Sequence, residues 1–578
     1  MQTSGWGPRS MPSSRSIAYF TMEVGLRTEM PTYSGGLGVL SGDTLRAAAD
    51  LGAPIVAITL LHRQGFFRQH LAADGTQTET APAWDPVEFL EPVAGNVSLR
   101  LEGREVRLRA WLYRLAGAGG SEVPLYMLDA DLPDNDPEDR AVTGQLYGGD
   151  QRYRLRQEAI LGIGGIAMLR SLGYDSIETY HMNEGHSALL TLALLDEAKG
   201  SSPAPSEGDI ASVRERCVFT THTPVPAGHD RFPLELVRSV LGEAMAATFE
   251  RLPCREGELL NMTQLGLFFS RYVNGVARRH GQVAQALYPG YKIEAITNGV
   301  HAGNWVSEPF AELFDREIPN WRLDNHYLRQ ALNLLVDDVL EAHQRAKRHL
   351  FAEVANRTGV RLDPAVMTVG FARRAAAYKR ADLVFSQPDN LRNIARQAGP
   401  LQFIYAGKAH PHDAPAKDLI KRVIAARDGL RDEIPVVYLE EHDMGLAKLL
   451  CSGVDLWLNN PQKPLEASGT SGMKAALNGV PSLSVLDGWW PEGWIEGVTG
   501  WSIGDNLDEE DDPAREAMSL YSKLSYVILP LFYGSPALFG RVMRSTIAIN
   551  GAYFTAQRML QQYLTSAYAQ HPMASVDS

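Results

Sequence analysis

A single lysine follows a glycine-rich stretch in the segment Glu466-Ala-Ser-Gly-Thr-Ser-Gly-Met-Lys474. Small residues and glycines leave backbone N–H groups uncovered before an apolar helix begins, and such amides at a helix N-terminus bind anions. Apolar neighbours, such as Met473 and Leu477, disfavour the charged form of the lysine and make it a usable amine nucleophile. An amine beside a phosphate site is what pyridoxal phosphate requires. The same pattern also fits a glycine-rich loop that leads into a core helix whose lysine reaches toward solvent.

A cluster of basic residues directly follows the predicted strand Met367–Ala372. It consists of Arg373, Arg374, Lys379 and Arg380. Loops at the carboxyl ends of such strands open into the ligand cleft of an α/β sheet, and a phosphate dianion binds guanidinium and ammonium groups held close together. A basic run also fits a solvated helix face. Here three alanines and a tyrosine separate the charges, which favours a phosphate site.

Two further patterns are weak when taken alone. The turn Gly35-Gly36-Leu37-Gly38 precedes a predicted helix, so the backbone can approach a ligand closely and direct a helix N-terminus at it. His222 follows the predicted strand Val218–Thr221, where a histidine is more often structural than catalytic. A glycine-rich helix start is likewise common in α/β proteins.

Short apolar runs alternate with helical stretches along the chain, which is the pattern of parallel α/β sheets. The predicted strands of the first half are Ile17–Phe20, Pro54–Leu61, Ile177–His181 and Val218–Thr221. Those of the second half are Met367–Ala372, Leu401–Ala406, Val436–Leu439, Val454–Leu458 and Ser482–Leu486. Periodicity therefore predicts two α/β domains, with the crossing between them near Asn298–Trp305.

Other segments are expected to form helices or to lie outside the parallel sheets. Helices are predicted at Gly36–Leu51, Tyr153–Leu172, Leu323–Asn356, Tyr521–Tyr533 and Arg541–Tyr568. Val97–Leu101 and Val106–Tyr113 alternate apolar and polar residues around Glu102-Gly103, which predicts an antiparallel hairpin outside the parallel sheet.

Composition limits the class of protein. At 578 residues, 45% of them hydrophobic and 21% charged, the chain fits two ordinary α/β domains. The net charge of −13 argues against a nucleic-acid partner. Three widely spaced cysteines suit a reducing compartment. The polar tail Met1–Ser16 has no apolar signal region and no run is long enough to span a bilayer, so we expect a cytoplasmic protein without a membrane partner.

The chain resembles the α-glucan (glycogen, starch, maltodextrin) phosphorylases, most closely the short bacterial type, from about Ile17 to the mid-500s. Landmarks of that family occur in its order. Besides the Lys474 segment they are Tyr33-Ser-Gly-Gly-Leu-Gly38, Asn183-Glu-Gly-His186, Thr221-His-Thr223, Thr297-Asn-Gly299, the Arg373–Arg380 run and Gly407-Lys-Ala409. The resemblance implies a GT-B glycosyltransferase fold, in which two doubly wound Rossmann-like domains face a cleft. The expected domains are 1–300, with the hairpin as an insertion, and 301–578, whose last helix packs back on the first domain.

The resemblance also implies roles for individual residues. Lys474 would anchor pyridoxal phosphate, and Arg374 and Lys379 would hold the attacking inorganic phosphate. The other residues expected at the cofactor are Thr470, Ser471, Gly36, Arg373 and Trp305. Those expected at the glucosyl unit are His222, with a catalytic role there, Gly36, Asn298, Tyr378, Glu466, Ser468, Gly469, Glu184 and His186. No metal is predicted, because His181, Glu184 and His186 do not have the helical zincin spacing.

The implied activity is reversible phosphorolysis of terminal α-1,4-glucosyl units to α-glucose 1-phosphate with retained configuration. Two alternatives are a sugar-nucleotide glucan synthase of the same fold and a catalytically silent glucan-binding protein. A homodimer is common in the family, but the sequence carries no interface signature. Departures from the long family members concern the cofactor phosphate, because His442 and Asp443 replace a tyrosine and an arginine.

Overall fold

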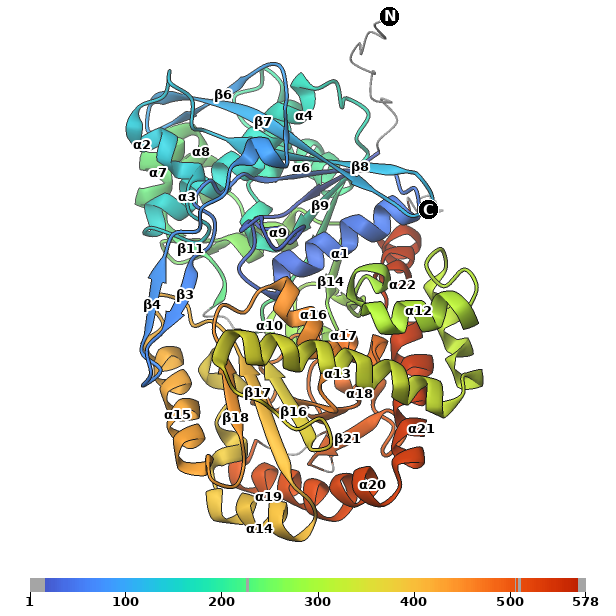
Figure 1. Ribbon diagram of the computed structural model, residues 1–578. Coiled ribbons are helices and arrows are strands. Elements are labelled where there is room, and N and C mark those ends of the chain that lie inside the picture. The colour runs from blue at the N-terminus through green and yellow to red at the C-terminus, as the bar shows by residue number, and fades with distance from the viewer. Residues whose placement is uncertain (1–15, 225–227, 505, 508–510, 570–578) are drawn as a thin grey trace, which may run out of the picture.

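The computed structural model describes residues 16–224, 228–504, 506–507 and 511–569. They form an α/β protein with one large sheet in each half of the chain (Figure 1). The predicted N-terminal tail, apart from Ser16, lies outside the described residues. The two sheets, with their helices, are stacked in Figure 1, with α1 (Gly36–Asp50) between them.

The first sheet has a long run of parallel strands. Their spatial order is β15 (Glu294–Ala295), β14 (Tyr272–Gly275), β10 (Cys217–Thr220), β9 (Thr179–Asn183), β1 (Ile17–Phe20), β2 (Ile55–Leu60) and β8 (Glu122–Asp129). Ile17 is in register with Ile55 on one side and Thr179 on the other. The strands predicted in this half are confirmed. The sequence pattern missed β8, β14 and β15.

Helices cover both faces of the first sheet. Strand side chains that point to one face pack against α3 (Gln151–Ala159) and α5 (Leu190–Lys199). Those on the opposite face pack against α1 and α22 (Ala556–Gln562). This division follows from the alternation of side chains along a strand. The last α-helix of the chain therefore lies on the first sheet, next to α1.

The predicted hairpin forms, but its expected place was wrong. β6 (Val97–Leu101) pairs antiparallel with β7 (Arg104–Ala116) across a turn in which Glu102 and Gly103 have φ of 52° and 77°. β7 also pairs antiparallel with β8, so the hairpin extends the large sheet and makes it mixed. The long β7 strand has enough residues to pair on both sides, which the short alternating pattern did not show.

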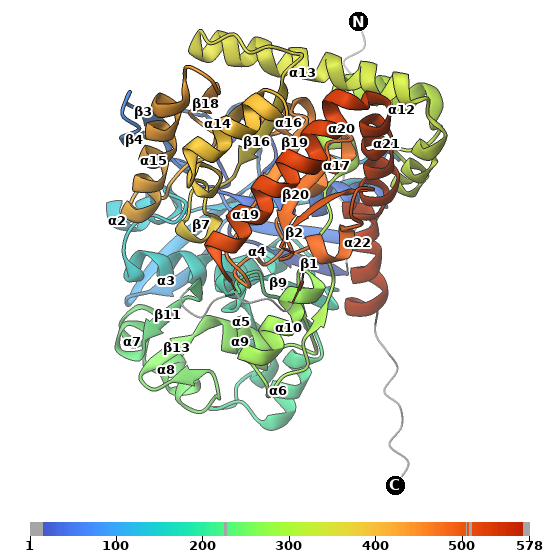
Figure 2. The same ribbon diagram turned by 90° about the horizontal axis from the view of Figure 1, so that it is seen from below.

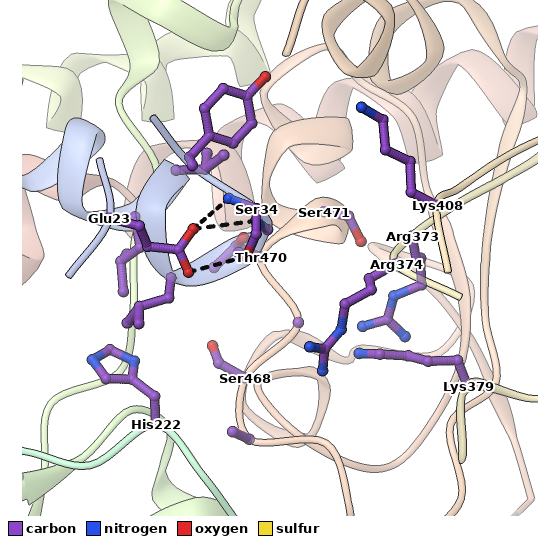
Figure 3. A pocket seen from close by; sticks show the side chains of 18 of the residues that line it. Glu23, Ser34, His222, Arg373, Arg374, Lys379, Lys408, Ser468, Thr470 and Ser471 are labelled. Atoms are coloured by element: carbon purple, nitrogen blue, oxygen red, sulfur yellow. Dashed lines mark hydrogen bonds between the residues drawn. The ribbon is translucent and has the colours of Figure 1, made fainter. Parts of the chain in front are cut away.

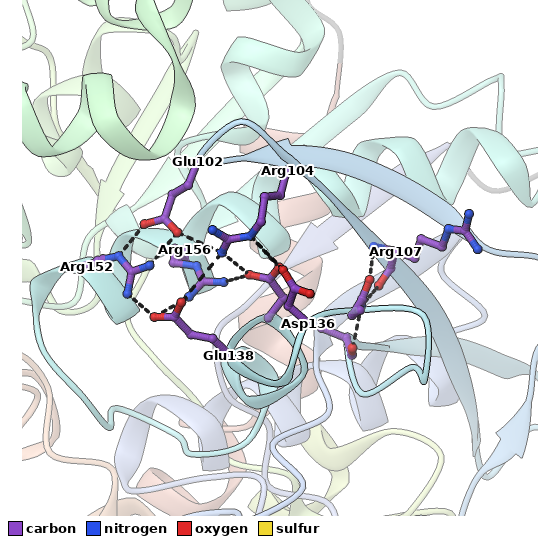
Figure 4. Close-up of polar contacts among 10 residues, drawn as sticks. Glu102, Arg104, Arg107, Asp136, Glu138, Arg152 and Arg156 are labelled. Atoms are coloured by element: carbon purple, nitrogen blue, oxygen red, sulfur yellow. Dashed lines mark hydrogen bonds and ion pairs between the residues drawn. The ribbon is translucent and has the colours of Figure 1, made fainter.

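Ion pairs hold the hairpin turn against two helices (Figure 4). Arg104 pairs with Asp139 of α2 (Pro137–Arg140) at 2.9 Å, and Arg152 of α3 donates to Glu102 at 2.6 Å. Arg156 reaches the same Asp139, and both side chains are buried. This network fixes α3, which carries the cavity residue Arg154, against the edge of the sheet.

The second sheet is entirely parallel. Its order is β18 (Val436–Leu439), β17 (Leu401–Ala406), β16 (Met367–Ala372), β19 (Leu456–Asn459), β20 (Ser482–Val485) and β21 (Gly500–Ile503). One face packs mainly against α13 (Val336–Thr358) and α16 (Met444–Gly453). The other packs against α14 (Pro388–Gln397) and α19 (Pro513–Lys523), as Figure 2 shows from below. The predicted strands of this half are confirmed, and β21 was missed.

Local caps and turns shorten the predicted long helices. α13 begins only at Val336, after a 3₁₀ segment at Asn325–Asn333. The predicted Arg541–Tyr568 helix is interrupted after Gly551, because the Thr555 side chain accepts from the Arg558 amide and starts α22. Within the described residues no single helix is long and apolar enough to cross a membrane, although the pair Pro513–Gly534 and Pro536–Gly551, bent by 104°, passes that test when taken together.

A β-hairpin of the first half reaches the second half. β3 (Arg68–Leu71) and β4 (Gln77–Thr80) project toward α15 (Ala414–Leu430) (Figure 1). Two buried glutamines make part of the contact. Gln69 donates to Gly407 O at 2.9 Å and accepts from the Glu441 amide at 3.0 Å. Gln77 donates to Ala409 O at 2.8 Å and accepts from the Ala409 amide at 3.0 Å. Side-chain amides thus pair with backbone across the junction of the two halves.

Candidate active site

A cavity of about 750 Å³ lies between the two halves, and every residue predicted for the site lines it. The predicted strands β1, β9, β10, β16 and β17 all end at this cavity, because their carboxyl ends carry the site loops. In Figure 3, Arg373, Arg374 and Lys379 project from one side of the cavity, and Glu23, Ser34 and His222 lie on the other. The structure therefore brings together residues from both halves that the sequence only placed in separate loops.

Lys474 lies on α17 (Ser471–Leu477) and is buried. Its Nζ is 4.0 Å from the centre of the Trp305 ring, a cation–π distance. Within the described residues the Nζ atom makes no hydrogen bond or ion pair. Burial lowers the pKa of Lys474, while the negative charge of Asp43 acts in the opposite direction. A buried amine with a lowered pKa and no hydrogen-bond acceptor is suited to nucleophilic attack on an aldehyde.

Glu466 binds two of the four cations in the predicted phosphate cluster. Its Oε2 accepts from Arg373 at 2.6 Å and from Lys379 at 2.7 Å. Burial raises the pKa of Glu466, but the charges and hydrogen bonds of the two cations outweigh it and bring the pKa to about 2. Both bonds use one oxygen, so Oε1 remains available to accept from a sugar hydroxyl. Lys379 is therefore not a free phosphate ligand here, which the sequence did not indicate.

Arg374 differs from its neighbours because it is exposed and lines the cavity. Figure 3 shows its guanidinium pointing into the space beside Lys379 and Arg373. Within the described part of the chain no carboxylate forms an ion pair with it. Of the basic run, Arg374 is thus the group best placed to meet an incoming phosphate.

The glycine turn leaves open space at the start of α1. A Cβ added at Gly35 or Gly36 would meet nothing within 4 Å, so a ligand can approach this backbone directly. The preceding amides are already used, because Glu23 Oε2 accepts from Ser34 N at 2.6 Å and from Gly35 N at 3.3 Å. Sequence reasoning missed Glu23. The sequence feature that could have identified it is its position just after β1, at the carboxyl end of a parallel strand, where ligands bind.

Two predicted sugar ligands carry buried oxygens without a partner. Asn298 Oδ1 and Ser468 Oγ make no hydrogen bond within the described residues, and both residues line the cavity. A buried polar oxygen costs free energy unless it is bonded. These two oxygens therefore call for a polyhydroxyl ligand or for water.

The polar groups of Glu184 and His222, by contrast, are hydrogen-bonded to other groups of the protein. The Glu184 carboxylate accepts from the His222 amide at 2.7 Å, from the Gly185 amide at 2.9 Å and from Thr223 Oγ1 at 3.1 Å. His222 Nε2 lies 2.6 Å from Asn183 Oδ1. His186 Nε2 pairs with Asp230 at 3.2 Å. Glu184 thus shapes the loop that carries His222, and its predicted direct contact with the sugar is not favoured by this geometry.

The departure at His442 and Asp443 has a local explanation. Asp443 is the N-cap of α16, where its Oδ1 accepts from the Leu446 amide at 2.8 Å, so the carboxylate is satisfied by the helix. Burial, with the charges of Lys474 and Lys408, lowers the pKa of His442 to about 3. His442 is therefore neutral, and its Nε2 has no partner within the described residues although the residue lines the cavity.

Comparison with known proteins gives a consistent result. The family model for carbohydrate phosphorylases matches residues 229–490. A maltodextrin phosphorylase of Thermococcus litoralis is 36% identical over 98% of this chain and 72% of its own length. A glycogen phosphorylase of Mycobacterium tuberculosis is 37% identical with the same coverage. An uncharacterised protein of Methanocaldococcus jannaschii is 30% identical over 96% of this chain and the whole of its own length.

Proposed function

Because the chain belongs to the carbohydrate phosphorylase family, we propose that it catalyses reversible phosphorolysis of α-1,4-glucans with pyridoxal phosphate bound to Lys474. A terminal glucosyl unit is transferred to inorganic phosphate, giving α-glucose 1-phosphate with retained configuration. One observation carries the proposal. The same cavity is lined by the Lys474 amine, by the exposed Arg374 and by the Asn298 and Ser468 oxygens, and among the described residues neither that amine nor those oxygens has a hydrogen-bond partner.

The residues around Lys474 fit the cofactor. The amine is buried and has no hydrogen-bond partner within the described residues, and Trp305 provides an aromatic surface 4.0 Å from it. The neutral His442 lines the cavity, and its Nε2 has no partner in the part of the chain that the structure describes. Thr470 and Ser471 lie at the start of the helix that carries Lys474. Lys474 would hold the cofactor covalently, and Thr470, Ser471 and His442 are the groups available to its polar atoms. When bound, pyridoxal phosphate would supply a phosphate group that relays a proton to and from the substrate phosphate.

The protein's own groups would then bind and orient the two substrates. Arg374 would hold inorganic phosphate, and Lys379 would assist it while remaining paired with Glu466. Glu466 Oε1, Asn298 and Ser468 would bind hydroxyls of the glucosyl unit and keep its anomeric carbon facing the phosphate. Positive charge held in a site screened from water stabilises the close approach of anions more than it would in bulk solvent.

We also assign the fold to the GT-B class. The support is that the second sheet is wholly parallel with helices on both faces, that the first sheet has a parallel run covered in the same way, and that the cavity lies where the carboxyl ends of both sheets meet. The expected boundary near residue 300 agrees with β15 as the last strand of the first sheet, and it stays a proposal.

The test is formation of glucose 1-phosphate from maltodextrin and inorganic phosphate, measured with the near-ultraviolet absorbance of the purified protein. We expect Lys474→Ala to lose both the cofactor absorbance and nearly all activity. Arg374→Ala should keep the absorbance and lose activity by about 100-fold, in the range found for a removed electrostatic contact to a reacting anion. Lys292→Ala, at a surface lysine, is the control. Full cofactor absorbance and an unchanged rate in Lys474→Ala would refute the assignment. Glucosyl transfer from a sugar nucleotide, without phosphorolysis, would favour the glucan synthase.

A further inference from the structure

Helix α1 presents a buried carboxylate to the cavity side of the molecule. Asp43 follows Gly36 by seven residues, or two helical turns, so the two lie on the same face of α1. Gly36 lines the cavity, and Asp43 lies deeper, with no exposed surface. Its Oδ2 accepts from Trp305 Nε1 at 2.7 Å. Its Oδ1 has no hydrogen-bond partner within the described residues, and Arg46 Nη1 is 3.9 Å away.

Trp305 connects Asp43 to Lys474. Asp43 accepts a hydrogen bond from the indole of Trp305, and the Trp305 backbone carbonyl accepts from the Asn478 side chain at 3.0 Å. The Lys474 Nζ lies over the centre of the same ring. The first half of the chain, through α1, therefore determines where the aromatic surface under the Lys474 amine lies.

Asp43 is also the carboxylate whose charge acts on Lys474. The other titratable groups that influence this amine are Cys451 and His442. Burial raises the pKa of Cys451 to about 12 and lowers that of His442 to about 3, so both are neutral near pH 7. Burial raises the pKa of Asp43, and the opposing charges of Lys474, Arg46 and His301 offset this only in part. An opposite charge within a few ångströms favours the protonated form of an amine.

We propose that Asp43 is a positioning residue for Lys474, which orients the Trp305 ring and supplies the negative charge that stabilises the protonated Lys474 nitrogen when the cofactor is attached. The inference rests on the proposed function, because it needs pyridoxal phosphate on Lys474. It adds a residue of α1 to the site, and it gives a role to a buried carboxylate whose Oδ1 has no hydrogen-bond partner within the described residues.

The test is a pH titration of the near-ultraviolet absorbance of the holoenzyme. In Asp43→Asn we expect the midpoint of the absorbance change to fall by about one pH unit, since the neutral amide removes the charge and keeps the shape. Asp43→Glu keeps the charge, so its midpoint should lie closer to that of the wild type. Asp50→Asn, on the same helix but paired with His301 at 2.8 Å, should leave the midpoint unchanged.

The outcomes are separable. A wild-type protein without any cofactor absorbance overturns the proposed function, and this inference with it. A normal wild-type titration with the same midpoint in Asp43→Asn and Asp50→Asn overturns only the role of Asp43. If Asp43→Asn does not fold, Asp43→Ser decides, because it also removes the charge, leaves Trp305 in place and keeps a polar group beside the indole. A downward shift in that variant supports the proposal, and an unchanged midpoint refutes it.

Discussion

Replacing Glu466 by glutamine tests how the cavity keeps its cations together. In the native protein one buried carboxylate oxygen accepts from both Arg373 and Lys379. Glutamine has nearly the same shape and keeps one accepting oxygen, but it carries no charge. Arg373 and Lys379 would then be buried without a counter-charge.

The size of the effect follows from the pKa of Glu466. The charges of its partners bring that pKa from 4.5 to about 2 against the opposing effect of burial. One pKa unit corresponds to about 1.4 kcal/mol, so the carboxylate contributes about 3 kcal/mol to the free energy of unfolding at pH 7. Loss of one partner of a buried ion pair costs about 3–5 kcal/mol in other proteins, which is the same order.

The sign of the pH dependence is also determined. Because the folded pKa is depressed, the contribution is fully present above the unfolded pKa of 4.5 and is lost as the pH falls toward about 2. The difference between the wild type and Glu466→Gln should therefore be constant from pH 8 to about pH 5 and shrink below that.

Urea unfolding, followed by tryptophan fluorescence between pH 8 and pH 3, measures the loss of unfolding free energy and its pH dependence. The control is Glu433→Gln, which also loses a carboxylate bound by arginine, Arg396, but at the surface. It should change the free energy of unfolding by less than about 1 kcal/mol. An equal effect of the two substitutions at pH 7 would refute the reasoning, and so would a Glu466→Gln effect that grows as the solution is acidified.

Two further predictions follow from the same structure. Burial raises the pKa of Asp487 to about 7, so the ionised carboxylate destabilises the fold at higher pH. Asp487→Asn should therefore increase the free energy of unfolding at pH 8 and increase it much less at pH 5. An equal increase at the two pH values would contradict this prediction. Gln69→Ala and Gln77→Ala remove side-chain bonds that join the halves, at about 1 kcal/mol for each bond. Gln77→Ala should speed hydrogen exchange of the Ala409 amide and Gln69→Ala that of the Glu441 amide, whereas the exposed Arg68→Ala should change neither rate. An unchanged exchange rate in the glutamine variants would show that the hairpin does not hold the junction.

Local sequence patterns gave most of the α/β elements and the loops of the site. β1, β16, β17 and β18 have the predicted bounds, because buried parallel strands are continuous apolar runs. The sequence showed the Lys474 segment because its glycines leave amides exposed at the start of a helix. It showed the basic run because four charges are clustered directly after a strand.

Tertiary structure decided which groups are partners. Asp43 and Trp305 are 262 positions apart, and Glu466 lies 93 positions from Arg373 and 87 from Lys379. A short motif carries no information about such pairs, because they depend on how the two sheets are placed against each other. Burial is likewise a property of the folded molecule, and it lowers the pKa values of Lys474 and His442. The sequence therefore determined the chemical groups of the cavity, and the packing of the two halves determined their charge states and partners.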